Sequence, residues 1–88
     1  MDQKVYAQIL INRIQSLCKK RGITINKLAD MSGITTSTID SLINGRAFNP
    51  RIQTLHKIAI AFNMTVAEFL DYEELNEYSF EDTSDEDE

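Results

Sequence analysis

Apolar residues recur every three or four positions along most of the chain, and no stretch alternates apolar and polar residues as a half-buried strand would. A first helix is expected over about residues 5–21, and Gly22 ends it because glycine adopts left-handed backbone angles easily. Its apolar stripe consists of Tyr6, Leu10, Ile14, Leu17 and Cys18. The pattern predicts an all-α protein.

A short second helix is expected over about residues 25–32, with Thr24 placed to cap its first turn. Gly33 follows, and glycine can turn the chain sharply without steric cost. The apolar positions of this helix are Leu28, Ala29 and Met31.

A third helix is expected almost at once, over about residues 36–44, between a Thr35 cap and Gly45. Its apolar side consists of Ile39, Leu42 and Ile43, and residues 36, 37, 40, 41 and 44 share the other side. Two short helices around a tight glycine turn form a helix-turn-helix, whose second helix enters the major groove of DNA.

Two further helices complete the pattern. Asn49 followed by Pro50 predicts the start of one over about residues 50–62, because proline suits the first helical position. Thr65 and Glu68 form a capping box that opens another, and Met64 is placed to pack against Phe69 across it. This last helix is expected over residues 66–70, with an extension to Leu75 left open.

The segment LADMSGITTSTIDSLINGRAFNPRIQTLHKIAIAFNMTVAEFL resembles the phage-repressor-like helix-turn-helix family, the Cro-type or xenobiotic-response-element class. The resemblance extends over about residues 10–70. The matching positions include Leu28, Ala29, Gly33, Ile34, Thr38, Ile39, Gly45, Pro50, Leu55, Ile58 and Ala59. It implies a compact five-helix bundle, a lambda-repressor-like domain with a central helix-turn-helix that binds double-stranded DNA as a two-fold homodimer.

The resemblance also implies roles for single residues. Base-reading positions at the start of the recognition helix fall on Thr36, Ser37 and Ser41, with Asp40 beside them. The positions implied for phosphate contacts are Thr24, Lys27, Asn44, Arg46 and Arg51. Phosphate contacts supply affinity and register, whereas base contacts select the sequence.

The base-reading set is unusual because it holds no Arg or Lys. Short hydroxyls can bond to most bases but lack the two-pronged discrimination of Arg on guanine. Asp40 can either accept a hydrogen bond from a cytosine amino group or repel phosphate and narrow the tolerated sites. Both interpretations stay open, and each leaves more of the specificity to dimerisation and DNA shape.

One departure from the family pattern concerns a buried Arg–Glu pair that many members hold between their first and third helices. The corresponding positions here are Cys18 and Ile43. Replacing both partners of a buried ion pair by apolar residues can be neutral or stabilising. The double change indicates an apolar version of the same fold.

Charge is divided sharply along the chain. Residues 1–70 hold all nine basic groups and four acids, whereas residues 71–88 hold ten acids and no basic group. We therefore predict a DNA-binding domain over residues 1–72 and an acidic tail over residues 73–88, largely disordered beyond about Tyr78. The tail can serve solubility or compete with DNA for the basic domain. Its apolar residues could also dock onto a second subunit or a partner protein: Tyr72, Leu75, Tyr78 and Phe80.

The residues that other classes of function require are absent from the sequence. Cys18 is the only cysteine, which excludes an intrachain disulfide and a cysteine-based zinc site, and the lone His56 is expected to be solvated. No phosphate loop, catalytic carboxylate pair or nucleophile–base arrangement occurs, so no enzyme, cofactor or metal is expected. The first residues lack a signal-peptide core, and the longest apolar run, residues 58–62, cannot span a bilayer. A cytoplasmic protein without a membrane partner is expected.

The sequence thus predicts a sequence-specific DNA-binding transcriptional regulator, repressor-like, that binds a palindromic operator as a homodimer. The alternative is an antitoxin or anti-regulator, whose acidic tail engages a basic partner and which binds DNA weakly or only with that partner.

Overall fold

The computed structural model describes residues 2–46 and 49–80, and this part of the chain is helical without a strand. Its helices are α1 (Asp2–Arg21), α2 (Ile25–Ser32), α3 (Thr36–Ile43), α4 (Ile52–Ala61), α5 (Val66–Leu70) and α6 (Glu73–Asn76). The all-α helix-turn-helix architecture is confirmed, but there are six helices instead of the expected five.

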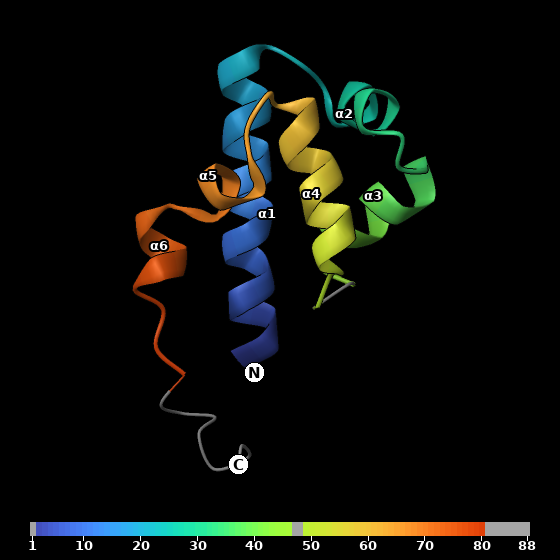
Figure 1. The fold of residues 1–88 in the computed structure, drawn as a ribbon. Helices are drawn as coiled ribbons and strands as arrows, with labels where there is room; N and C mark the ends of the chain where they lie inside the picture. Colours follow the sequence, from blue (N-terminus) through green and yellow to red (C-terminus); the bar gives the residue numbers. More distant parts are fainter. Residues whose placement is uncertain (1, 47–48, 81–88) are drawn as a thin grey trace.

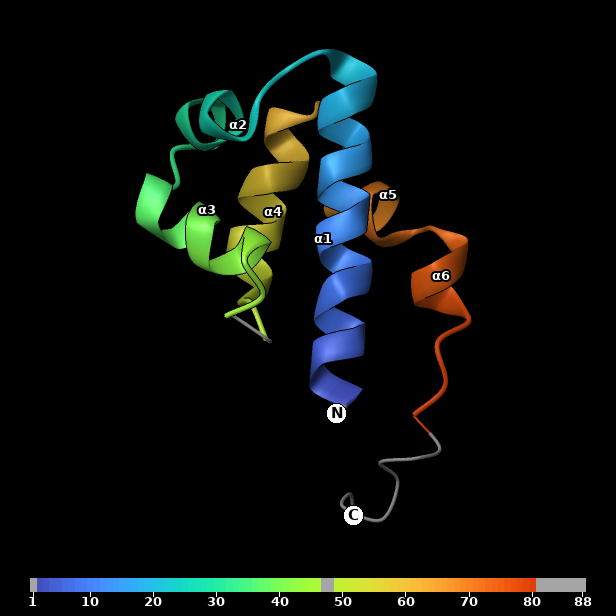
Figure 2. The ribbon, with the colours of Figure 1, turned by 180° about the vertical axis from the view of Figure 1, so that it is seen from behind.

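Helices α1 and α4 form the middle of the molecule (Figure 1). Helices α2 and α3 lie on one side of this pair, and α5 and α6 lie on the other. The view from behind shows the same separation (Figure 2). The helix-turn-helix is therefore supported from one side only, which leaves its outer surface open.

Three predicted caps are present. The hydroxyl of Thr24 accepts a hydrogen bond from the backbone N–H of Lys27 at 3.0 Å, and Thr35 accepts one from Thr38 at 3.1 Å. Thr65 and Glu68 form the reciprocal capping box of α5. Gly33 has a φ of 73°, the left-handed conformation that the turn between α2 and α3 requires.

Helix α4 begins later than predicted. It starts at Ile52 behind an extended Arg51, whose side chain makes no capping hydrogen bond, so Asn49 and Pro50 do not open it. Pro50 instead lines an apolar groove together with Ile52 and Leu55. Packing between elements therefore overrides the local preference of proline for the first helical position.

The sixth helix arises because α5 stops at Leu70 instead of continuing to Leu75. The Arg13 guanidinium of α1 binds the carbonyls of Glu68 and Phe69, at 3.0 and 2.9 Å, and so satisfies the open end of α5. The backbone leaves the helical region at Asp71, with φ −89° and ψ 82°, and α6 begins after Tyr72.

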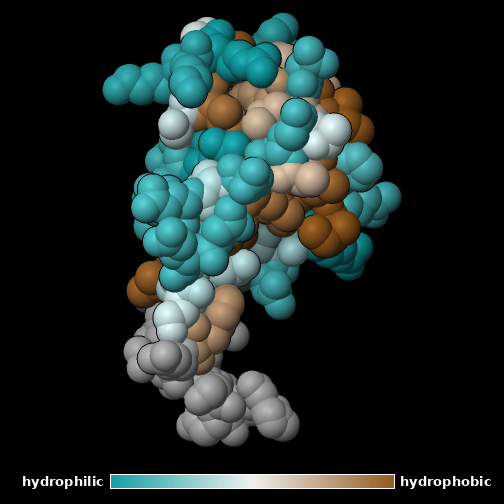
Figure 3. All heavy atoms as spheres, turned by 60° about the vertical axis from the view of Figure 1, so that its left-hand side comes forward, coloured by the Kyte–Doolittle hydropathy of each residue, from teal (hydrophilic) through white to brown (hydrophobic). Residues whose placement is uncertain are grey.

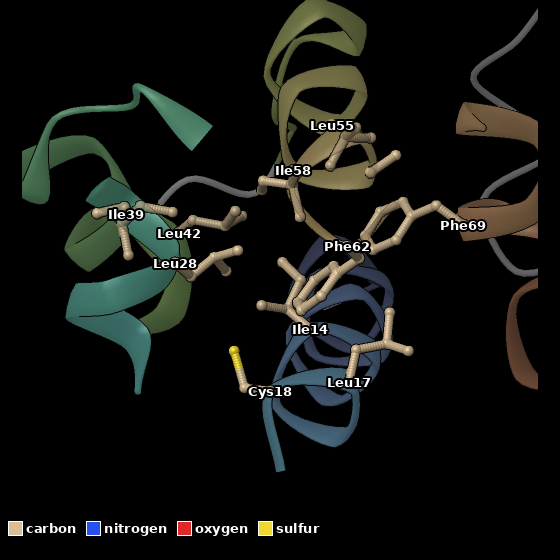
Figure 4. Packing of buried hydrophobic residues seen from close by; sticks show 12 residues of the cluster. Ile14, Leu17, Cys18, Leu28, Ile39, Leu42, Leu55, Ile58, Phe62 and Phe69 are labelled. Carbon is tan, nitrogen blue, oxygen red and sulfur yellow. The ribbon is translucent and has the colours of Figure 1, made fainter. Parts of the chain in front are cut away.

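The core draws on α1 to α5 (Figure 4). Phe69 points toward Phe62, whose own ring lies beside Ile14 of α1, while Ile39 and Leu42 enter from the helix-turn-helix. The fully buried large side chains are Ile14, Leu28, Ile39, Leu42, Ile58, Phe62 and Phe69. This cluster joins the helix-turn-helix to α1 and α4.

Three single positions complete the comparison with the predicted core. Met31, one of the three apolar positions of α2, does not join the core, because it is 46% exposed. Cys18 is buried, and Ile43 packs partly buried against the same apolar cluster. Burial raises the pKa of the Cys18 thiol, which keeps it neutral.

Candidate nucleic-acid interface

Helix α3 presents one polar face to solvent and one apolar face to the core. Thr36, Ser37 and Asp40 are exposed and Ser41 is half-buried. On the other face, Ile39 and Leu42 are at most 1% exposed. The buried side fixes the rotation of the helix, so the structure brings the four predicted base-reading residues together on one open surface.

Hydroxyl groups at the start of α3 divide into two kinds. Thr35 and Thr38 bond to each other, with the Thr35 hydroxyl 3.0 Å from that of Thr38. Thr36, Ser37 and Ser41 make no side-chain hydrogen bond within the described residues. A base edge would therefore meet hydroxyls that need not break an existing bond to donate or accept.

The predicted phosphate-contact residues surround this face. Lys27, Asn44, Arg46 and Arg51 are all exposed. Thr24 is also exposed; its oxygen accepts one hydrogen bond as the cap of α2, and its hydroxyl proton can still donate to a phosphate oxygen. The charged members flank α3 at both ends, which suits contact with phosphates on either side of a groove.

A shallow, open hollow of about 740 Å³ separates α2 from the start of α3. Thr24 and Lys27 line it on the α2 side, and Thr36 lines it on the α3 side. Asn26 and Asp30, which were not predicted from the sequence, also line it. Asp30 follows Lys27 by three residues and Asn26 by four, and these spacings indicate that it shares a side of the helix with each of them.

A second hollow of about 330 Å³ links α3 to the start of α4. Arg51 lines it together with Thr38, Leu42, Asn49, Pro50 and Thr54. This arrangement places Arg51 beside α3, although Arg51 is the eighth residue after the end of that helix. Asn49 and Thr54 were not predicted here, because only the late start of α4 puts them against α3.

Among the described residues, no three His, Cys, Asp or Glu side chains are grouped to hold a metal ion. Within the same residues, no helix combines the length and apolarity needed to cross a bilayer.

Comparison with known proteins agrees with this geometry. The model of the Cro/C1-type HTH DNA-binding domain matches residues 13–74. The chain belongs to this family. The matched range includes α2, α3 and every residue of the candidate interface, so the helix-turn-helix is that of a Cro/C1-type DNA-binding domain.

Relatives of this Cro/C1-type domain include two regulators of Bacillus subtilis (strain 168). The chain is 30% identical to the HTH-type transcriptional regulator SinR over 66 residues, and 35% identical to the HTH-type transcriptional regulator SlrR over 65 residues. These matches cover 75% and 73% of this chain but only 60% and 43% of SinR and SlrR. The chain thus matches less than two thirds of the length of each of these regulators.

A solved structure is also similar. The fold matches the crystal structure of the prophage Lp1 protein 11 with a TM-score of 0.73 and 26% identity, covering 82% of this chain and 95% of that one. The lambda-repressor-like architecture expected from the sequence is confirmed by this likeness together with the family match.

Proposed function

We propose that the protein is a sequence-specific transcriptional regulator, repressor-like, that acts by occupying an operator and performs no chemistry. The observation that carries the proposal is the open polar face of α3, flanked by basic side chains and fixed by a packed core. Its Cro/C1-type family and its similarity to two proteins named as transcriptional regulators support the same function.

In this proposal Thr36, Ser37, Asp40 and Ser41 read base edges, while the flanking set of Thr24, Lys27, Asn44, Arg46 and Arg51 contacts phosphates. Neutral hydroxyls discriminate bases weakly, so a single half-site would hold the protein poorly. Two half-sites on one palindromic operator would add their contributions.

The proposed homodimer forms through α5 and the segment after it. An apolar groove of about 210 Å³ lies there, lined by Leu10, Ile52, Leu55, Leu70 and Leu75 among others. Ile52 at its edge is 63% exposed, as is Ile60 further along α4. A two-fold dimer would present two copies of α3 to half-sites roughly 34 Å apart.

A binding selection from random double-stranded DNA with the purified protein tests the function. We expect enrichment of a palindromic site whose affinity falls as salt rises, because phosphate contacts release counterions. If no site is enriched, the proposed function is wrong for the protein alone. That result would favour an antitoxin or anti-regulator that needs a partner.

Asp40 offers a sharper test of base reading. If its carboxylate accepts from a cytosine amino group, Asp40→Ala should relax the preference at one base pair, worth about 1–3 kcal/mol of discrimination. If it only repels phosphate, the variant should bind all sequences more tightly. Binding to the selected site and to its single-base variants separates the two, and Glu73→Ala, on α6 outside the candidate interface, serves as the matched loss of an exposed acid.

A further inference from the structure

Two hollows meet at the part of the chain that leads from α3 into α4. We call the hollow of about 330 Å³ beside α3 the α3–α4 hollow, and the one of about 210 Å³ that Leu10 and Leu70 help to line the apolar groove. Asn49 and Pro50 line both of them. Pro50, which is half-buried, therefore forms part of the wall that separates the two.

The residues after Pro50 alternate between the two hollows. Arg51 lines the α3–α4 hollow, and the next residue, Ile52, lines the apolar groove. One turn later, Thr54 lines the hollow and Leu55 lines the groove. Residues three apart share a side of a helix, so the start of α4 has one side toward α3 and another toward the groove. Leu55 is only 6% exposed, so its burial fixes this rotation and with it the side on which Arg51 lies.

The backbone of Arg51 is held on both sides. Its carbonyl accepts the first hydrogen bond of α4, from the N–H of Leu55 at 3.2 Å. On the other side, the ring of Pro50 locks its own φ at about −65° and keeps Asn49 out of the helical region. Arg51 itself is extended, with φ −70° and ψ 148°. The chain therefore enters Arg51 in a restricted direction and leaves it in a fixed one.

The two arginines assigned to phosphate contact after α3 are held by different means. The backbone N–H of Arg46 donates to the carbonyl of Ser41 at 2.9 Å, so α3 itself holds Arg46. Among the described residues, Arg51 has no hydrogen bond to α3, and its guanidinium has neither a hydrogen bond nor an ion pair. The place of Arg51 beside α3 therefore depends on Pro50 and on the first turn of α4.

Tertiary contacts also fix the wall of the apolar groove that α1 provides. Tyr6 lines the groove, and its ring centroid lies 5.2 Å from that of Tyr78 and 5.3 Å from that of Phe80. Both partners belong to the acidic arm, residues 71–80. On the side of α5 and α6, which Figure 3 brings forward, hydrophobic side chains come to the surface among hydrophilic ones. Pro50 thus borders a groove whose α1 wall is held in place.

We propose that Pro50 is a positioning residue for Arg51: its ring, held between the apolar groove and the α3–α4 hollow, directs the guanidinium toward a DNA phosphate beside α3. The proposal rests on the proposed function, in which Arg51 contacts phosphate, and adds the residue that prepares this contact before DNA binds. A side chain that is ordered in advance loses less conformational entropy on binding. Without the ring, Arg51 takes the binding orientation for only part of the time, and the apparent dissociation constant rises by the inverse of that fraction.

Pro50→Gly removes the ring and frees the backbone around it. Titration with short duplex DNA of mixed sequence at low salt should show binding about 2- to 10-fold weaker than that of the wild type, for a competent fraction of one half to one tenth. The slope of log affinity against log salt should stay near the wild-type value, because the contact still forms in the complex. Arg51→Ala should instead lower that slope by about 0.9, because the phosphate contact itself is lost. Pro50→Ala, which keeps a Cβ, should bind with an affinity between those of Pro50→Gly and the wild type, and it carries the test if the glycine variant does not fold.

Two double-mutant cycles show whether the effect passes through Arg51. In an Arg51→Ala background, Pro50→Gly should weaken DNA binding no further, because no guanidinium is left to position. In an Arg46→Ala background it should again weaken binding about 2- to 10-fold, because α3 holds Arg46 independently. Thr65→Ala is the matched control: it removes the cap of α5, across α1 and α4 from α3, and should bind DNA as the wild type does. If Pro50→Gly weakens binding equally in both backgrounds, its role is only structural and the proposal is wrong.

A second measurement needs no DNA. In the wild type, the NMR order parameter of the Arg51 N–H should be about 0.85, the value of a rigid backbone, and Pro50→Gly should lower it below about 0.6. The order parameter of the Arg46 N–H should not change. An unchanged value at Arg51 would overturn the proposal. A lowered value in a protein that binds no duplex DNA would support the restraint by Pro50 and reject the proposed DNA-binding function.

Discussion

The double substitution Arg46→Ala and Arg51→Ala is expected to weaken DNA binding on the order of 100-fold at 50 mM salt, because each lost phosphate contact removes about 0.9 from the slope of log affinity against log salt. Both guanidinium groups are exposed, and Arg51 lines the hollow between α3 and α4. The loss should be similar for operator and unrelated DNA, because phosphates carry no sequence information. Titrations at several salt concentrations measure both affinity and slope.

The matched control is Lys19→Ala with Lys20→Ala, which removes the same charge from the exposed last turn of α1. It should lower affinity less and leave the salt slope nearly unchanged, because these residues are outside the proposed phosphate contacts. If both double variants lower the affinity and the salt slope equally, net charge alone explains the loss. The assignment of Arg46 and Arg51 as phosphate contacts is then wrong.

Phe62→Ala is expected to destabilise the fold by about 3–5 kcal/mol, as large-to-small changes of buried aromatics do. The ring is fully buried against Phe69 and Ile14 at the centre of the core. Since the free energy of unfolding of a small domain is only about 5–15 kcal/mol, the melting temperature should fall by roughly 15 °C or more. Thermal and urea unfolding followed by circular dichroism measure the effect.

Ile60→Ala, in the last turn of α4 just before Phe62, provides the comparison. Ile60 is 63% exposed, so its truncation should change the free energy of unfolding by no more than about 0.5 kcal/mol. The Phe62 carbonyl still accepts from the Arg21 guanidinium in Phe62→Ala, because that contact involves only the backbone of residue 62. A Phe62→Ala protein as stable as Ile60→Ala would contradict the central position of the ring.

Local sequence patterns predicted most of the helix-turn-helix. The bounds of α2 agree with the prediction, α3 ends one residue earlier, and the caps at Thr24, Thr35 and Thr65 are present. These features depend on residues within one turn of each other, such as a hydroxyl and the N–H three residues later. Such interactions can be predicted directly from the order of residues.

The predictions from the sequence were wrong where the outcome depends on contacts between residues far apart in the chain. The start of α4 depends on Pro50 packing in a groove with Leu10 of α1, and the end of α5 depends on Arg13. Met31 has the apolarity of a core residue, but the short helix turns it toward solvent. None of these outcomes follows from neighbours in the sequence.

The acidic segment, too, was predicted only in part from the sequence, and tertiary contacts decided the rest. Composition separated it from the basic part of the chain, and the resemblance placed Thr36, Ser37, Asp40 and Ser41 on one surface, where their roles in base reading remain predictions. That Tyr72, Tyr78 and Phe80 fold back onto α1 could not be predicted, because their partners Ile9 and Tyr6 precede them by more than sixty residues.

By itself, the sequence determined the helical class, the helix-turn-helix and the division of charge, because periodicity, caps and composition are local properties of the chain. Only the tertiary structure decided where α4 begins, why a sixth helix forms and where the acidic arm lies. Those features depend on contacts between α1 and residues 50–80, and such contacts exist only once the core has brought the two ends of the chain together.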